Sequence, residues 1–143
     1  MTRAETAYNN MVESKMNCSQ AVLSAFCDKL GIDKATALRL ARGFGGGMGR
    51  TGRTCGAVTG AYLVIGLAEQ SAAKEGLEAV YKGINEFDAT FIGRFNSTEC
   101  NDLLGYNLST PEGLACARAE GLFTKICPGF VKGAAEILEE SLG

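Results

Sequence analysis

The sequence predicts an all-α protein, a helical bundle of five to seven helices that forms a single domain over residues 1–143. Apolar residues recur at helical spacing along almost the entire chain, and no segment alternates apolar and polar residues as a strand would. A hydrophobic content of 46% and a charged content of 21% are ordinary for a globular protein. A chain of 143 residues is also long enough to bury one core.

Most helix starts are predicted by side chains that favour the N-cap position, where an oxygen accepts hydrogen bonds from the free N–H groups of the first turn. The expected caps and their helices are Asn17 before residues 18–30, Asp33 before a helix that ends near Gly43, Thr54 before residues 55–70, Ser97 before a short helix, and Thr110 before a helix with Pro111 at its first position. Gly31 is expected to close the helix over residues 18–30.

The remaining helices follow from apolar periodicity: one over residues 5–15, a long one over residues 71–94, and a last one that begins at Pro128. The helix over residues 55–70 is almost entirely apolar, so we expect it at the centre of the bundle, directly after a glycine-rich loop. The long helix carries an apolar stripe that we interpret as core rather than as a cofactor-stacking surface: Val80, Ile84, Phe87, Phe91 and Phe95.

Composition excludes several functions. The 14 basic residues nearly balance the 16 acidic ones, which argues against a nucleic-acid partner. The longest apolar run, residues 57–68, is shorter than the about 20 residues that span a bilayer, so no membrane segment is expected. Without an apolar secretion signal near the N-terminus, we expect a cytoplasmic protein, in which six cysteines should stay reduced. The chain has no histidine, which excludes Ser-His-Asp and Cys-His catalysis.

Four of the six cysteines lie at predicted helix starts, and they are our candidates both for catalysis and for metal binding: Cys18, Cys55, Cys100 and Cys127. Free N–H groups and the helix dipole favour a thiolate at such positions, and thiolates are the nucleophiles, redox centres and metal ligands. We expect Cys27 and Cys116 to be buried, inert thiols. No pair has Cys-x-x-Cys spacing, so the fold would have to bring the four together.

The segment from Arg42 to Gly60 contains eight glycines and three arginines. Glycine-rich backbone can turn its N–H groups toward an anion and approach it closely, and the charges of Arg50 and Arg53 beside Cys55 are expected to favour its thiolate further. We therefore expect a loop that closes over Cys55 and holds a cofactor or a small anionic molecule, and its candidate residues are Gly45, Gly46, Gly47, Gly49, Arg50, Arg53 and Gly56. The segment also matches G-x-G-x-x-G, but a predicted helix precedes it rather than the strand that a dinucleotide site needs.

Four segments resemble the C_GCAxxG_C_C family, which is described as redox-active. "CGAVTG" at Cys55–Gly60 is similar to the central element, with cysteine before glycine here. "NCSQAV" at Asn17–Val22, "TECNDLLG" at Thr98–Gly105 and "CPGFV" at Cys127–Val131 are similar to the other cysteine segments. The resemblance covers nearly the whole chain and implies redox chemistry through the same four cysteines.

Three functions remain open at this point. The four cysteines could hold an iron–sulfur cluster or another thiolate-bound metal for electron transfer. They could instead cycle between thiol and disulfide, as in a thiol-dependent oxidoreductase. The alternative from another class is a non-catalytic structural or carrier protein with a zinc site made of four cysteines. A redox partner or a small anionic molecule is the expected partner, and the small residues on the helices would allow a homodimer.

Overall fold

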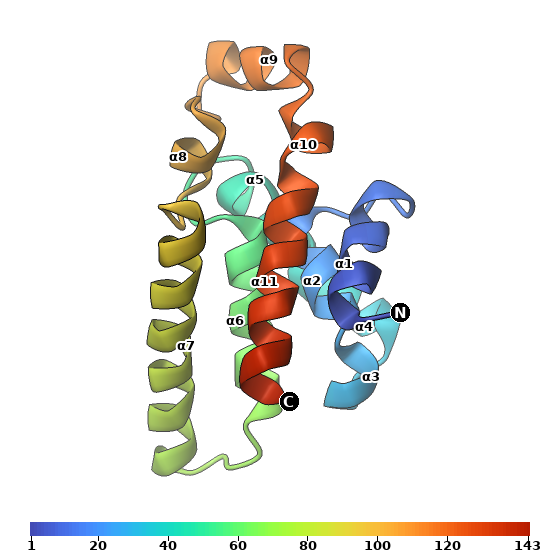
Figure 1. The fold of residues 1–143 in the computed structure, drawn as a ribbon, viewed down its shortest axis with the longest axis vertical. Coiled ribbons are helices and arrows are strands. Elements are labelled where there is room, and N and C mark those ends of the chain that lie inside the picture. The colour runs from blue at the N-terminus through green and yellow to red at the C-terminus, as the bar shows by residue number, and fades with distance from the viewer.

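The structure is a computed structural model that describes all residues, 1–143. It is all-α, with a single isolated bridge between Thr54 and Glu99 in place of any sheet (Figure 1). The helices are α1 Arg3–Val12, α2 Cys18–Ser24, α3 Cys27–Leu30, α4 Lys34–Ala41, α5 Gly45–Met48, α6 Gly56–Ala68, α7 Lys74–Phe95, α8 Cys100–Leu104, α9 Pro111–Ala119, α10 Leu122–Lys125 and α11 Cys127–Leu142, with a 3₁₀ turn at Arg42–Phe44. The all-α prediction is confirmed, although several short helices bring the number above the expected five to seven.

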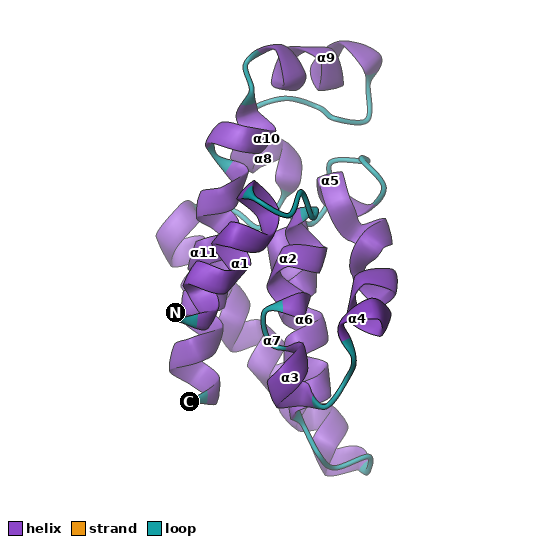
Figure 2. Cartoon of the chain, turned by 90° about the vertical axis from the view of Figure 1, so that its right-hand side faces the viewer, coloured by secondary structure: helices purple, strands orange, loops and turns teal.

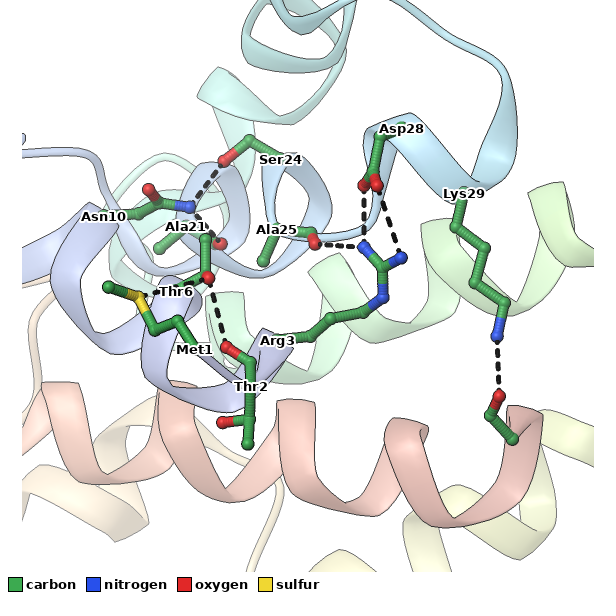
Figure 3. A network of polar contacts seen from close by, with 11 residues as sticks. Met1, Thr2, Arg3, Thr6, Asn10, Ala21, Ser24, Ala25, Asp28 and Lys29 are labelled. Carbon is green, nitrogen blue, oxygen red and sulfur yellow. Dashed lines mark hydrogen bonds and ion pairs between the residues drawn. The ribbon is translucent and has the colours of Figure 1, made fainter.

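The predicted helix over residues 18–30 is broken into α2 and α3. Figure 3 shows the contacts made at this break: the Arg3 guanidinium donates to the Ala25 carbonyl at 3.0 Å and to Asp28 Oδ1 at 2.7 Å. In an unbroken helix that carbonyl would accept from the amide of residue 29. Gly31 closes α3 in the left-handed conformation, as predicted.

α6 lies at the centre of the bundle, packed against α2, α7 and α11. Its first six residues are all buried, and small residues let α2 approach. A Cβ added to Gly60 would lie 2.9 Å from the Ser19 carbonyl oxygen of α2, so only glycine permits this spacing. The prediction of a central apolar helix is confirmed.

A row of phenylalanines joins α7 to α11. Phe91 is fully buried, and its ring centroid lies 5.8 Å from that of Phe87 and 4.7 Å from that of Phe95. Phe95 meets Phe130 of α11 edge-on at 5.2 Å. Phe87, Phe91 and Phe95 of the predicted stripe therefore belong to the core or pack against it, whereas Val80 and Ile84 are half-buried and lie outside it. The phenylalanines lead toward the N-terminus of α11.

α2, α6 and α11 all begin at the same end of the bundle, where α5, α8 and α10 also lie (Figures 1 and 2). α9 lies across this end, above α5. The helix starts that carry the four candidate cysteines are thus gathered in one region, although they are far apart in sequence. No helix combines the length and the apolar character that crossing a membrane would require.

Candidate functional site

Four buried cysteines line one small internal cavity of about 20 Å³. Cys18, Cys100 and Cys127 are the first residues of α2, α8 and α11, and Cys55 is the N-cap of α6. Their exposed fractions are only 4% to 9%. The wall is completed by Gly46, Gly56, Leu103, Leu104, Phe123 and Phe130. The fold thus brings together the four cysteines singled out in the sequence.

Cys55 and Cys100 are held together by backbone pairing. The Cys55 amide donates to the Thr98 carbonyl at 2.8 Å, and the Cys100 amide donates to the Arg53 carbonyl at 2.7 Å. This pairing places both cysteines where α6 and α8 begin. The expected caps at these two helices are wrong, because Cys55 and Glu99 occupy the N-cap positions and Thr54 is used in the bridge.

Cys18 is positioned by the residue before it. The Asn17 side chain accepts from the Gln20 amide at 3.0 Å, as a capping box requires, and its Nδ2 donates to the Arg42 carbonyl at 3.0 Å. The predicted cap is confirmed, and it also fastens the start of the glycine-rich segment to α2. A Cβ on Gly56 would lie 2.9 Å from the Cys18 Cβ, so glycine there lets Cys18 sit directly against α6.

The glycine-rich segment is a compact left-handed turn rather than an open loop. Five consecutive residues, 46 to 50, have φ between 61° and 71°. The Gly52 amide donates to the Gly46 carbonyl at 3.1 Å, and the Arg53 amide donates to the Gly47 carbonyl at 3.0 Å. A Cβ on Gly47 would lie 2.8 Å from the Cys100 Cβ. The turn therefore covers the cysteines closely, as expected of glycine backbone.

The two arginines of the turn do not lie where we expected them. Arg53 is exposed, and its Nε donates to Thr51 Oγ1 at 3.0 Å. Arg50 is exposed as well and faces an outer cleft that Cys18 lines but Cys55 does not. Neither arginine contributes to the pKa of Cys55, so the expectation that they favour its thiolate is wrong.

Burial, rather than the helix N-terminus, dominates the ionisation of two of the cysteines. It raises the pKa of Cys55 to about 12, although the amides of Ala57 and Val58 near its sulfur act in the opposite direction. Burial likewise raises the pKa of Cys100 to about 12. The sulfur of Cys55 makes no full capping hydrogen bond. The predicted thiolates at these two positions are therefore wrong, because the desolvation of a charged sulfur outweighs the nearby N–H groups.

Cys18 and Cys127 influence the ionisation of one another most strongly. The neighbouring Cys127 sulfur, together with burial, raises the pKa of Cys18, and the Cys18 thiol lowers the pKa of Cys127. Of the four cysteines, Cys127 is therefore the only one whose thiolate is favoured. The expectation of a favoured thiolate holds at this one cysteine, and its cause is a neighbouring cysteine.

The raised pKa of Cys55 leads to a prediction on stability at alkaline pH. The unfolded chain ionises this thiol near pH 9, whereas the folded chain keeps it neutral up to about pH 12. Its stabilising contribution is thus complete below pH 9 and is lost as the pH rises toward 12, by at most about 1.4 kcal/mol per pH unit. Urea denaturation from pH 8 to pH 10.5 measures the free energy of unfolding of the wild type and of Cys55→Ala. We expect the stability of the wild type to fall toward that of Cys55→Ala as the pH rises. A difference between the two that stays constant over this range would contradict the raised pKa of Cys55.

The other two cysteines lie outside the cluster. Cys27 is half-buried at the start of α3, and Cys116 is exposed on α9. The prediction that both are buried is wrong, since α2 ends before Cys27 and Cys116 occupies a solvent-facing position. No group of three or more cysteine, aspartate or glutamate side chains is arranged so that it could hold a metal ion. As they stand, the four cysteines do not fit a metal centre.

An outer cleft of about 560 Å³ adjoins the cluster. Cys18 is the only one of the four cysteines that lines it. Three arginines surround the opening: Arg42, Arg50 and Arg118. Of these the sequence singled out only Arg50. Arg42 could have been found from its position immediately before the glycines, but nothing in the sequence connects Arg118, 68 residues after Arg50, with this site.

An all-α protein with four buried, clustered cysteines has the features of a small cysteine-dependent redox protein. Residues 16–141 match the model of the family described as "Putative redox-active protein (C_GCAxxG_C_C)". The chain belongs to this family, as its four cysteine segments indicated. Searches of the curated proteins and of the solved structures found no match.

Proposed function

We propose that this protein is a thiol–disulfide redox protein in which Cys18 and Cys127 are the reacting pair. The proposal depends on one observation, that Cys18 and Cys127 line the same small cavity and that each has the largest influence on the pKa of the other. Two thiols on the wall of so small a cavity can approach one another to a disulfide bond length of about 2.05 Å. Both side chains project from the first residues of helices, so their positions are set by rigid elements.

The reaction is an exchange with a disulfide substrate, R–S–S–R′. Cys18 attacks one sulfur of the substrate because it is the member of the pair that lines the outer cleft. Its proton passes to the Cys127 thiolate, and R′–S⁻ leaves. Cys127 then gives its proton to R′–S⁻ and attacks the Cys18 sulfur, which expels R–S⁻. The substrate disulfide gains two electrons, and the protein pair becomes oxidised to a disulfide.

Cys55 and Cys100 assist without reacting first. Both remain neutral thiols near pH 7, because burial raises the pKa of each to about 12. Each is coupled electrostatically to Cys18, which places them near enough to the pair to influence its charge. Such chemistry suits the cytoplasm, where the pair would be returned to the thiol form by reduced thiols.

The second candidate is a metal or iron–sulfur centre held by all four cysteines. It is favoured by a single observation, that their side chains line the same cavity. A site of this type would require the four sulfurs to rearrange, because no three of them are arranged for a metal ion. A four-cysteine zinc site in a non-catalytic protein would need the same rearrangement.

The test is a redox titration of anaerobically purified protein in dithiothreitol buffers, with disulfides mapped by mass spectrometry and with metal and acid-labile sulfide measured in parallel. We expect one disulfide, Cys18–Cys127, to be lost in both Cys18→Ser and Cys127→Ser. Cys116→Ser is the matched control and should leave it unchanged. Circular dichroism would verify that each variant is folded.

Two results would overturn the proposal. One is a protein in which no pair of thiols is oxidised reversibly, or in which a different pair is oxidised first. The other is stoichiometric zinc, or iron with acid-labile sulfide, lost on replacing any of the four cysteines. That result would establish the metal centre instead.

A further inference from the structure

The outer cleft is strongly positive. Arg42, Arg50 and Arg118 line it, and no aspartate or glutamate does. None of these three arginines belongs to the ion pairs of the chain, which join Arg3 to Asp28, Lys82 to Glu86 and Arg94 to Glu136. In a protein whose net charge is −2, three unpaired guanidinium groups around one cleft are not explained by overall composition. They would repel one another less if an anion lay between them.

The three arginines come from parts of the chain that meet only in the fold. Arg42 follows α4, Arg50 ends the left-handed turn, and Arg118 lies on α9. Figure 2 shows α9 above α5, at the end of the bundle where the cysteines lie. Arg50 has a φ of 61°, which lies in the left-handed region that residues with a Cβ rarely adopt. Arg50 adopts this conformation next to glycines, for which it is unstrained, and the Arg50 side chain lines the cleft.

The size and walls of the cleft suit a small molecule. Its volume of about 560 Å³ lies within the range of small-ligand sites. Guanidinium groups bind carboxylates through paired N–H donors. Met11 and Phe123 provide apolar surface for an aliphatic chain, and Cys18 is the reactive group that the cleft presents.

We propose that this cleft binds a small dianion, and that the dianion is the disulfide substrate, held by Arg42, Arg50 and Arg118 with its S–S bond against Cys18. The second part rests on the proposed thiol–disulfide function, whereas the first does not. The arginines thus select substrates by charge, and Cys18 and Cys127 carry out the thiol–disulfide exchange.

The exchange test uses three disulfides of similar size as oxidants of the reduced protein: 3,3′-dithiodipropionate, which is doubly anionic, neutral bis(2-hydroxyethyl) disulfide, and doubly cationic cystamine. At low salt we expect the anion to react about tenfold faster than the cation, because a positive cleft concentrates anions. Arg50→Gln and Arg118→Gln should each remove several-fold of this preference, measured as the ratio of the rates with the anionic and the cationic disulfide. Arg39→Gln is the matched control, since this exposed arginine lies one turn before Arg42 and outside the cleft.

A binding test separates the two parts of the proposal. Thiodipropionate carries the same two carboxylates but has no S–S bond, and its binding can be measured by calorimetry. We expect it to bind the wild type and Cys18→Ser, and to bind at least tenfold more weakly to the double variant Arg50→Gln/Arg118→Gln. Binding without exchange would keep the anion site and overturn the thiol–disulfide function. Exchange without binding and without charge preference would keep that function and overturn the anion site.

Discussion

Gly47→Ala is expected to lower the free energy of unfolding by about 3 kcal/mol, from two costs that add. Gly47 has a φ of 71°, where a residue with a Cβ loses about 1–2 kcal/mol. Its new methyl group would also lie 2.6 Å from the Arg53 amide nitrogen and 2.8 Å from the Cys100 Cβ. Backbone on one side and a buried cysteine on the other leave little room to adjust, so overpacking adds about 1–3 kcal/mol.

Gly49→Ala is the matched control for this prediction. Gly49 has a φ of 64°, but a Cβ there would meet no atom within 4 Å. It should therefore cost only the conformational penalty, about 1–2 kcal/mol. Urea denaturation of both variants measures the difference. If the two variants lost equal stability, the close contact of the turn with Cys100 would be refuted.

Phe91→Ala is expected to cost about 3–5 kcal/mol, because it leaves a cavity in the middle of the aromatic row. Phe91 is 0% exposed, stacks on Phe87 and packs against Phe95 with a tilt of 50° between the rings. The row continues to Phe130, which lines the cysteine cavity. We therefore also expect faster reaction of the buried thiols with a neutral thiol reagent, since the wall beside them is loosened.

Tyr81→Ala on the same helix is the control for that variant. Tyr81 is 53% exposed, so its replacement should change the free energy of unfolding by less than about 0.5 kcal/mol. Guanidinium chloride denaturation gives the two stabilities, and the loss of free thiols with time gives the reactivity. A loss below about 1 kcal/mol for Phe91→Ala would mean that the row is not part of the core.

The fold could be predicted from the sequence because its signals are local. Asn17 and Asp33 cap helices as expected, and Thr110 with Pro111 starts α9. The break between α2 and α3 could not be predicted in this way, since the contacts made there come from Arg3, which lies 25 residues before Asp28. α10 was also missed, because a four-residue helix is too short to show apolar periodicity.

For the site, the sequence indicated the identity of the cysteines but not their chemistry. Position at a helix start is visible in the sequence, whereas burial is not. Burial is what keeps Cys55 and Cys100 neutral. The pairing of Cys18 with Cys127 is equally hidden, because it joins residues 109 positions apart along the chain. The arginines were misplaced for a related reason: the five consecutive positive φ angles from Gly46 to Arg50 include the non-glycine residues Met48 and Arg50, and nothing in the sequence indicates that these two adopt them.

Cys18 is the only one of the four clustered cysteines that lines both the outer cleft and the inner cavity. An oxidant that enters the outer cleft therefore meets Cys18 before the other three thiols, which do not line that cleft. Under the proposed function, Cys18 is the point of entry to the buried cluster, and replacing it should slow the oxidation of the remaining thiols more than replacing Cys55 or Cys100 does.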